Sequence, residues 1–215
     1  MNISPDVRLM IAIPTLGSIH TDLVARLLTW QSQFPPNQIA LYLTKHLAPV
    51  DRARNAIVQQ FLNQRLKDQP LTHLLMIDSD TVPQPDAIKR LLSHDLPFVS
   101  GMTPIANRNK ETGALEFFDN CFESVTRDGE GVRTNIAHRN TGLKTINRCG
   151  AACLLVKREV FEALNPPYFQ FELDETGTKH TRSEDIRFCD DVKAAGYTLY
   201  ADTDVICTHH KTIEF

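Results

Sequence analysis

Apolar residues in the first hundred positions alternate between short continuous runs and helically spaced sets. The runs Arg8–Pro14 and His73–Asp78 are typical of strands covered on both faces, which are apolar at successive positions. Shorter runs predict strands at 39–44 and 97–101. Apolar residues spaced three or four apart predict three helices. The first contains Leu23, Val24, Leu27 and Leu28, and the third is a short helix at about 86–93. The second covers 51–66, with Ala53, Ile57, Phe61 and Leu62 facing inward. This alternation predicts a parallel sheet with helices on both faces.

The pattern changes after residue 101. Residues 102–149 are polar and glycine-rich, with poor periodicity, so we expect short antiparallel strands and a mobile loop there. Strands are predicted again at 153–157, 197–201 and 205–207, and helices at 158–164 and 183–195, the second closed by Gly196 in the left-handed conformation. The sequence has no internal repeat and no low-complexity linker, which predicts one domain over 1–215 with two lobes.

Composition narrows the classes of protein that fit. The 215 residues include 23 Lys+Arg and 26 Asp+Glu, a formal charge of -3, which argues against a nucleic-acid partner bound by phosphate neutralisation. No apolar run is long enough to span a bilayer, and residues 1–6 lack the pattern of a signal peptide. The five cysteines are odd in number and form no Cys-x-x-Cys pair, so we expect reduced core thiols in a cytoplasmic protein.

Two carboxylates, Asp78 and Asp80, directly follow the third predicted strand. At alternate positions they offer hard oxygen ligands to a divalent cation, which can bridge the phosphates of a nucleoside diphosphate. Parallel sheets bind ligands at the carboxyl ends of their strands, where Thr15 also lies. The competing interpretation is an ordinary turn, which Asp and Ser favour. The position after an apolar strand gives the two interpretations equal weight.

Two other motifs are each explained by an ordinary structural role when considered alone. Glu184 and Asp185 begin a predicted helix, where acids stabilise the positive end of the dipole, or where a carboxylate could serve as a general base. His209 and His210 offer cation ligands, but histidines are also common on surfaces. Local pattern favours the structural interpretation of both motifs.

Arg54 and the small residues Gly150 and Ala151 leave two interpretations equally open. Arg54 could pair with a donor phosphate or with Asp78, or it could be solvated at the start of a helix. Gly150 and Ala151 could let a ligand approach the backbone, or they could permit tight core packing.

The order of these motifs resembles the GT-A glycosyltransferases, and within them the broad family-2-like set. The resemblance runs from about Leu9 to Lys211 and rests on the segments Ile13-Pro14-Thr15, Leu75–Pro83, Phe98–Gly101, Gly150–Phe161, Ser183–Tyr197 and Asp204–His209. It implies an α/β GT-A (Rossmann-like) fold with a mixed, mostly parallel central sheet flanked by helices and a smaller acceptor-side lobe. Residues 1 to about 101 would form the nucleotide-binding half, and about 102–215 the half that completes the acceptor and metal sites.

The resemblance also implies an activity. A hexosyltransferase of this kind moves a sugar from a nucleotide-diphosphate sugar, with a UDP-sugar favoured, to an acceptor hydroxyl with the help of Mn²⁺ or Mg²⁺. Asp80 and His209 would hold the metal, Asp78 would share it or hold the donor ribose, and His210 is a weaker candidate. The remaining implied positions are Pro14, Thr15, Arg54 and Ser79 on the donor, Gly150 and Ala151 on the acceptor side, and Asp185 as general base with Glu184 beside it.

Two departures and two rival functions remain. The chain ends at Phe215, without the C-terminal helices of many relatives, and residues 103–148 match no acceptor pattern. A nucleotidyltransferase would carry a glycine-rich basic loop after the first strand, whereas Pro14–Gly17 has one glycine and no basic residue. A non-catalytic nucleotide-sugar-binding protein is the second rival. The sequence leaves open the donor base and sugar, the acceptor, inversion or retention, and whether the chain forms a homo-oligomer.

Overall fold

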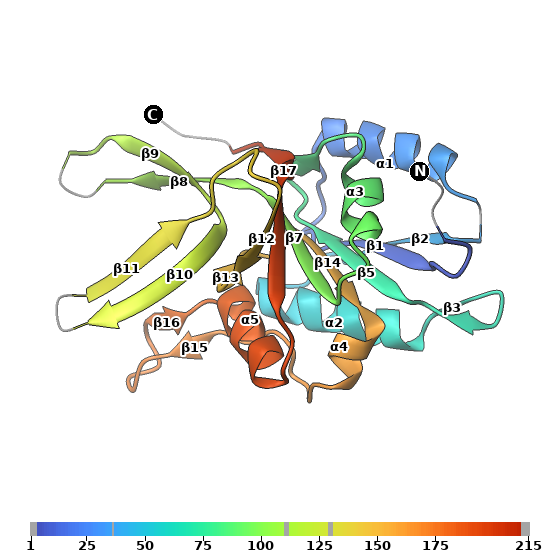
Figure 1. The fold of residues 1–215 in the computed structure, drawn as a ribbon. Coiled ribbons are helices and arrows are strands. Elements are labelled where there is room, and N and C mark those ends of the chain that lie inside the picture. The colour runs from blue at the N-terminus through green and yellow to red at the C-terminus, as the bar shows by residue number, and fades with distance from the viewer. Residues whose placement is uncertain (1–3, 36, 110–111, 129–130, 212–215) are drawn as a thin grey trace.

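The apolar run after Arg8 forms an inner strand of a central mixed sheet (Figure 1). The structure is a computed structural model that describes residues 4–35, 37–109, 112–128 and 131–211. The strand order in the described residues is β12-β17-β7-β14-β5-β1-β2, with β6 paired to β17. These strands are β1 (Leu9–Ile13), β2 (Ile39–Leu43), β5 (His73–Ile77), β6 (Thr81–Pro83), β7 (Phe98–Met102), β12 (Leu143–Ile146), β14 (Cys153–Lys157) and β17 (Leu199–His209).

Strand directions confirm a mixed sheet in which one direction prevails. β1 is parallel to β2 and β5, while β14 runs antiparallel to both β5 and β7. β7 therefore points the same way as β5, and β17 is parallel to β7. Of the sheet strands in the described residues, β1, β2, β5, β7 and β17 share one direction, and β6, β12 and β14 oppose it.

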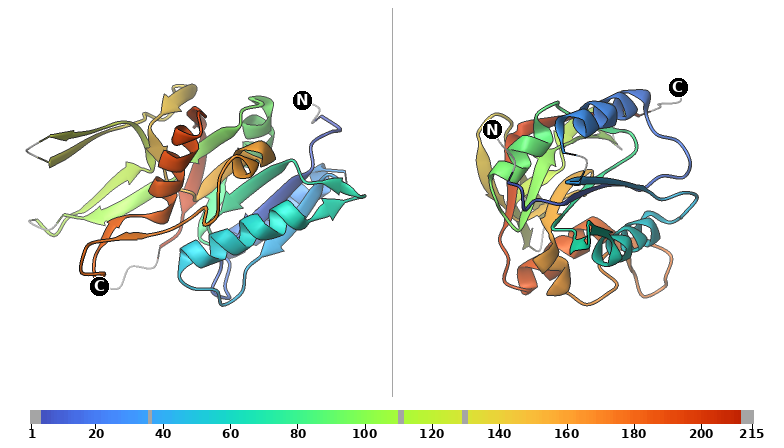
Figure 2. Two further views of the ribbon diagram at one scale, coloured as in Figure 1. Left: turned by 90° about the horizontal axis from the view of Figure 1, so that it is seen from below. Right: turned by 90° about the vertical axis from the view of Figure 1, so that its right-hand side faces the viewer.

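Helices cover both faces of this sheet, as the two views of Figure 2 show. The helices are α1 (Thr21–Gln33), α2 (Val50–Asn63), α3 (Ala87–Ser93), α4 (Arg158–Glu162) and α5 (Glu184–Ala194). Alternate residues of β1 face opposite cores: Leu9, Ile11 and Ile13 join the cluster that includes α1 and α3, whereas Met10 and Ala12 join the cluster with α2, α4 and α5. Burial of each large apolar side chain contributes about 1.5–3 kcal/mol, so the sheet is fixed from both sides.

The middle of the chain forms hairpins beside the central sheet (Figure 1). The expected antiparallel strands are present, and β8 pairs with β9 while β10 pairs with both β11 and β13. Small two-stranded sheets complete the fold. The remaining strands are β3 (Arg65–Leu66), β4 (Gln69–Pro70), β8 (Pro104–Arg108), β9 (Leu115–Asp119), β10 (Cys121–Asp128), β11 (Gly131–Ile136), β13 (Arg148–Cys149), β15 (Glu172–Leu173) and β16 (His180–Arg182).

The predicted helix that contains Leu23, Val24, Leu27 and Leu28 is α1. Its inward face is formed by Leu23, Leu27 and Trp30, whereas Val24 and Leu28 are 42% and 64% exposed. Two local predictions are wrong. The second helix ends at Asn63, since the next residues turn back to form the β3–β4 hairpin. The two predicted late strands are one strand, β17, which passes through the polar residues 202–204 without a break.

Two compositional expectations can be compared with the structure. All five cysteines are free and buried, as expected for core thiols. None of the helices in the described residues combines the length and apolar character that a bilayer crossing requires.

Candidate functional site

Asp78 and Asp80 lie in a tight turn at the carboxyl end of β5. The Asp78 amide donates to the Ala152 carbonyl at 3.1 Å, which ties the turn to the segment before β14. The Thr81 amide donates back to the Asp78 carbonyl at 3.0 Å and closes the turn. The buried strand thus ends abruptly, and the Asp78 and Asp80 side chains stay 30% and 45% exposed at the edge of the sheet.

The last sheet strand brings a histidine to Asp80. β17 pairs with β6, so His209 lies opposite Thr81, and its Nε2 is 3.2 Å from an Asp80 carboxylate oxygen. The other ring nitrogen, Nδ1, is 2.7 Å from the Pro104 carbonyl. The hydrogen bond to Asp80 raises the pKa of His209. Burial acts to raise the pKa of Asp80, but His209 outweighs it and the pKa lies below its usual value.

The neighbouring histidine diverges from this pair. The His210 amide donates to the Asp80 carbonyl at 2.8 Å, while its ring stacks on His20 with centroids 3.6 Å apart. His209 and His210 are adjacent in sequence and belong to two different clusters of side chains.

Arg54 joins the second helix to both acidic motifs. Its guanidinium donates to Asp78 at 2.8 Å and forms an ion pair with Glu184 of α5. The Arg54 and Glu184 side chains are only 4% and 6% exposed. Burial acts against the charge, but the carboxylates of Asp78 and Glu184 outweigh it and hold the pKa of Arg54 above its usual value. Of the alternatives left open by the sequence, the structure has Arg54 paired with Asp78.

Asp185, the next residue of α5, lies beside Gly150. Its Oδ1 accepts from the Ser183 hydroxyl, and a Cβ at Gly150 would lie 3.4 Å from its Oδ2. The same Cβ would lie 2.9 Å from the side-chain nitrogen of Asn120, so a side chain at position 150 would require Asn120 to move. Glu184 and Asp185 therefore differ in surroundings: Glu184 is enclosed with Arg54, and Asp185 is half-buried beside the glycine.

The loop after β1 lies at the same carboxyl edge of the sheet as the Asp78–Asp80 turn. Pro14 follows β1, and the buried Thr15 donates its hydroxyl proton to the Ser18 carbonyl at 2.6 Å and its amide proton to the Thr44 hydroxyl at 3.1 Å. Farther along the loop, the His20 amide donates to the Ser79 carbonyl at 2.9 Å, which links this loop to the Asp78–Asp80 turn. Ala151, beside Gly150, is 2% exposed.

Sequence reasoning missed three contacts of this site. The Arg54–Glu184 pair joins residues 130 positions apart, and nothing in either local segment indicates it. Asn120 lies between β9 and β10, is 2% exposed and accepts from the Thr103 amide at 3.0 Å. The Pro104 carbonyl that contacts His209 belongs to the backbone and has no side-chain signature.

A cavity of about 710 Å³ lies elsewhere, near the amino end of β5. Its lining includes His73, Lys157 and Asp95, and it contains none of the residues in the turn at the opposite end of that strand. The ion pair of Lys157 with Asp95, at 2.6 Å, compensates charge within this lining.

Comparison with known proteins supports the fold. No protein-family model matches this chain, and no curated protein sequence matches it. The solved structure "Crystal Structure of A197 from STIV" is similar over 96% of this chain and 87% of that chain, with 19% identity and a TM-score of 0.60. "Crystal structure of GalNAc-T7 with UDP, GalNAc and Mn2+" matches 98% of this chain but 45% of that chain, with 11% identity and a TM-score of 0.56.

An inositol-1-phosphate CTP transferase from T. maritima has a TM-score of only 0.49, at 10% identity over 96% of this chain and 90% of that chain. Such a low score supports no conclusion. The first two similarities, at 19% and 11% identity, support the fold and by themselves show no particular activity. Together with the sheet order, they show that this chain has a Rossmann-like α/β fold of the GT-A kind.

Proposed function

We propose that this protein is a metal-dependent glycosyltransferase that uses a nucleotide-diphosphate sugar, with a UDP-sugar favoured, and an acceptor hydroxyl. The observation that carries the proposal is the Asp80–His209 pair at the carboxyl edge of the sheet. Sheets of this kind bind ligands at that edge. The family-2-like assignment is part of the proposal, and it rests on the motif order alone.

The chemistry of the donor set fits a divalent cation. The Asp80 carboxylate is half-exposed, and its hydrogen bond with His209 brings an oxygen and a nitrogen to one place. Metal-binding histidines commonly donate their other ring N–H to a carbonyl, and the Pro104 carbonyl lies at that distance from Nδ1. Asp80 and His209 would hold Mn²⁺ or Mg²⁺, with Asp78 as a further ligand or a ribose contact. When bound, the cation would neutralise charge on the leaving diphosphate.

Arg54 organises the donor side. Its two terminal guanidinium nitrogens are engaged by Asp78 and Glu184, so its role is to hold the Asp78 carboxylate in place rather than to bind a phosphate directly. Pro14, Thr15 and Ser79 lie on segments that meet the turn, and they would contact the nucleotide. Glu184 would act through Arg54, because its carboxylate is buried in an ion pair with that guanidinium.

Asp185 would act as the general base on the acceptor in an inverting reaction. Its carboxylate would take the acceptor hydroxyl proton as the oxygen bonds to the anomeric carbon, while the bond from that carbon to the diphosphate oxygen breaks. Gly150 lies beside this carboxylate, and Gly150 and Ala151 would belong to the acceptor side. In a retaining reaction the same carboxylate would position the acceptor.

The fold comparison adds support for this chemistry. The GalNAc-T7 structure is one with UDP, GalNAc and Mn²⁺, and these ligands belong to that protein. The present chain combines a fold of the same kind with an Asp–His pair at the carboxyl edge of its sheet. Nucleotide-sugar chemistry is therefore the natural one to test first.

A donor screen tests the proposal. The full chain would be incubated with UDP-sugars, GDP-sugars, CTP or ATP, with Mn²⁺ or with a chelator, while release of nucleoside diphosphate and of pyrophosphate is measured. We expect slow Mn²⁺-dependent hydrolysis of a UDP-sugar, faster with a matching acceptor and absent in Asp80→Asn. Release that is equal with chelator, or pyrophosphate release from CTP or ATP in place of sugar transfer, would contradict it.

A further inference from the structure

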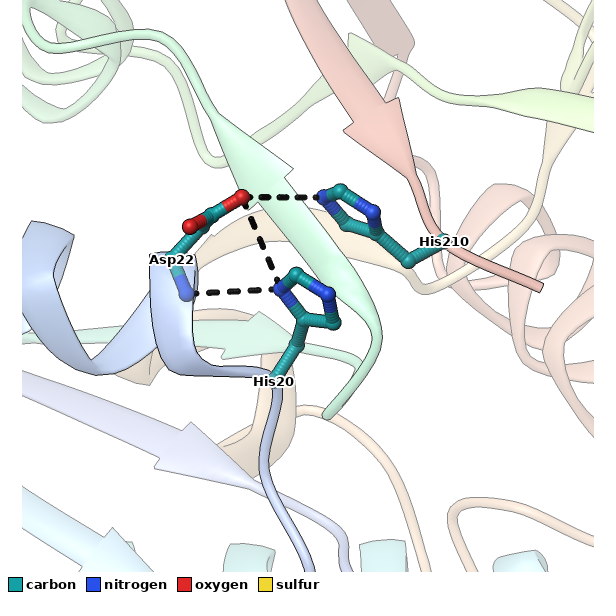
Figure 3. A group of neighbouring side chains, drawn as sticks. All are labelled: His20, Asp22 and His210. Atoms are coloured by element: carbon teal, nitrogen blue, oxygen red, sulfur yellow. Dashed lines mark hydrogen bonds and ion pairs between the residues drawn. The ribbon is translucent and has the colours of Figure 1, made fainter. Parts of the chain in front are cut away.

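Two histidines and an aspartate form a second cluster beside the Asp80–His209 pair (Figure 3). His20 immediately precedes α1, Asp22 lies in its first turn, and His210 follows β17. The three side chains come from opposite ends of the chain and point toward one another (Figure 3). They take no part in the proposed transfer reaction.

The separations of the three polar groups resemble those around a metal ion. One oxygen of Asp22 is 3.7 Å from His20 Nδ1 and 3.6 Å from His210 Nε2. All three ligand atoms lie within 4.8 Å of one another. In a tetrahedral zinc site with bonds of about 2.0–2.1 Å, neighbouring ligand atoms are about 3.3 Å apart. Two of the three separations therefore need to contract by only a few tenths of an ångström.

The hydrogen bonding of His20 also suits a metal ligand. Its Nδ1 lies 3.3 Å from the Asp22 amide and accepts a hydrogen bond from it through its lone pair. The bond is long and easily exchanged for a stronger interaction. A cation would take the lone pair that the helix start now uses.

Ring orientation defines what must change when an ion binds. The His20 and His210 rings are stacked at 3.6 Å and within 10° of parallel. The lone pairs of stacked rings run side by side, so at least one ring must turn about its Cβ–Cγ bond to share an ion. The two side chains are 34% and 32% exposed, which leaves room for this rotation and for a water ligand.

We propose that His20, Asp22 and His210 form a second cation site that takes zinc or a similar late transition metal. Two imidazole nitrogens and one carboxylate oxygen suit Zn²⁺, Co²⁺ or Ni²⁺ better than Mg²⁺ or Mn²⁺, which prefer more oxygen ligands. The site is separate from the Asp80–His209 pair and does not depend on the proposed glycosyl transfer.

The backbone indicates what such an ion would do. The His20 amide holds the Ser79 carbonyl, and the His210 amide holds the Asp80 carbonyl, at 2.9 and 2.8 Å. An ion joining the two histidines would clamp the start of α1 to the end of β17 across the turn that contains Asp80. It would stabilise the folded protein by an amount that grows with the free zinc concentration, because it would bind the folded form more tightly than the unfolded one.

Zinc calorimetry on the chelator-treated full chain, with Co²⁺ absorption as a second readout, tests the site. The informative variants are His20→Asn, which retains a residue able to cap α1, and His210→Gln. The exposed His180 provides the control His180→Gln. Removing a ligand is expected to weaken zinc binding at least about tenfold and to abolish the rise in melting temperature on zinc addition. His180→Gln and Asp80→Ala should keep both properties.

Two results would overturn the proposal. One is wild-type zinc affinity in both His20→Asn and His210→Gln, the result expected if the cluster is only a helix cap with an ion pair. The other is loss of zinc binding in Asp80→Ala alone, which would assign the zinc to the Asp80–His209 pair. Melting curves without metal verify that each variant folds, and either cluster variant suffices for the test. Mn²⁺-dependent UDP binding is a separate measurement, so failure here is distinguishable from failure of the proposed function.

Discussion

Replacing Arg54 by methionine removes the positive charge that Asp78 and Glu184 share and keeps a side chain of similar length. The largest cost arises at Glu184, whose carboxylate is 6% exposed and would be left without its charged partner. Asp78 is 30% exposed and can be hydrated instead. Breaking a buried ion pair costs roughly 3–5 kcal/mol. For a chain of this length that corresponds to a fall in melting temperature of roughly 6–20 °C.

Urea denaturation of four proteins measures the effect: wild type, Arg54→Met, Glu184→Gln and the double variant. The double variant should recover about 2–3 kcal/mol relative to the sum of the single changes, because the unpaired charge is gone. The matched control is Arg187→Met on the same helix as Glu184. Its ion pairs with Glu172 and Asp191, at 3.9 and 3.6 Å, are partly exposed, so this change should cost no more than about 1 kcal/mol. Equal losses in Arg54→Met and Arg187→Met, or no recovery in the double variant, would refute the reasoning.

Three further predictions concern catalysis, pH and dynamics. Asp185→Asn should lower transfer by roughly a hundredfold or more, with donor affinity and melting temperature nearly unchanged, and a stable variant with wild-type turnover would remove Asp185 from the mechanism. Burial, with Lys157 nearby, lowers the pKa of His73 to about 4, so between about pH 6.5 and 4 the unfolded chain binds a proton that the folded chain does not. The free energy of unfolding should therefore fall as pH falls through this window. Measured by urea denaturation, the fall should be up to about 3 kcal/mol larger in wild type than in His73→Gln. Parallel pH profiles of the two proteins would argue against this. Before donor binds, backbone amides of the hairpins within 103–148 should exchange hydrogen faster than those of β5, because residues 103–148 have poor apolar periodicity. Equal protection of the two segments would contradict this prediction.

The fold is predictable where local pattern and topology agree. The run after Arg8 and the run His73–Asp78 are apolar at successive positions, as inner strands covered on both faces must be, and they form β1 and β5. The reversed direction of β14 has no local signature, because a buried strand has the same pattern in either direction. Local pattern divides β17 in two because residues 202–204 are polar. In the structure Asp202 is buried and bonded to Arg90 and His94, partners distant in sequence.

The candidate site is predictable only in part, for a related reason. The turn that contains Asp78 and Asp80 follows from a strand that ends in acidic residues, and the structure places His209 beside Asp80. The division of Glu184 and Asp185 between an enclosed ion pair and an open position depends on Arg54 and Gly150, which lie on other elements. The divergence of His209 and His210 likewise depends on what each ring meets across the fold.

Calorimetry of UDP binding in the presence of Mn²⁺ tests the central claim most directly. The comparison is wild type with Asp80→Asn, and the matched control is Asp86→Asn, which changes an exposed acid on the same connection between β5 and α3. The proposed site predicts Mn²⁺-dependent UDP binding in wild type and Asp86→Asn, and its loss in Asp80→Asn. Wild-type affinity in Asp80→Asn, or UDP binding that is unchanged by a chelator, would contradict the assignment of the cation and the donor to this edge of the sheet.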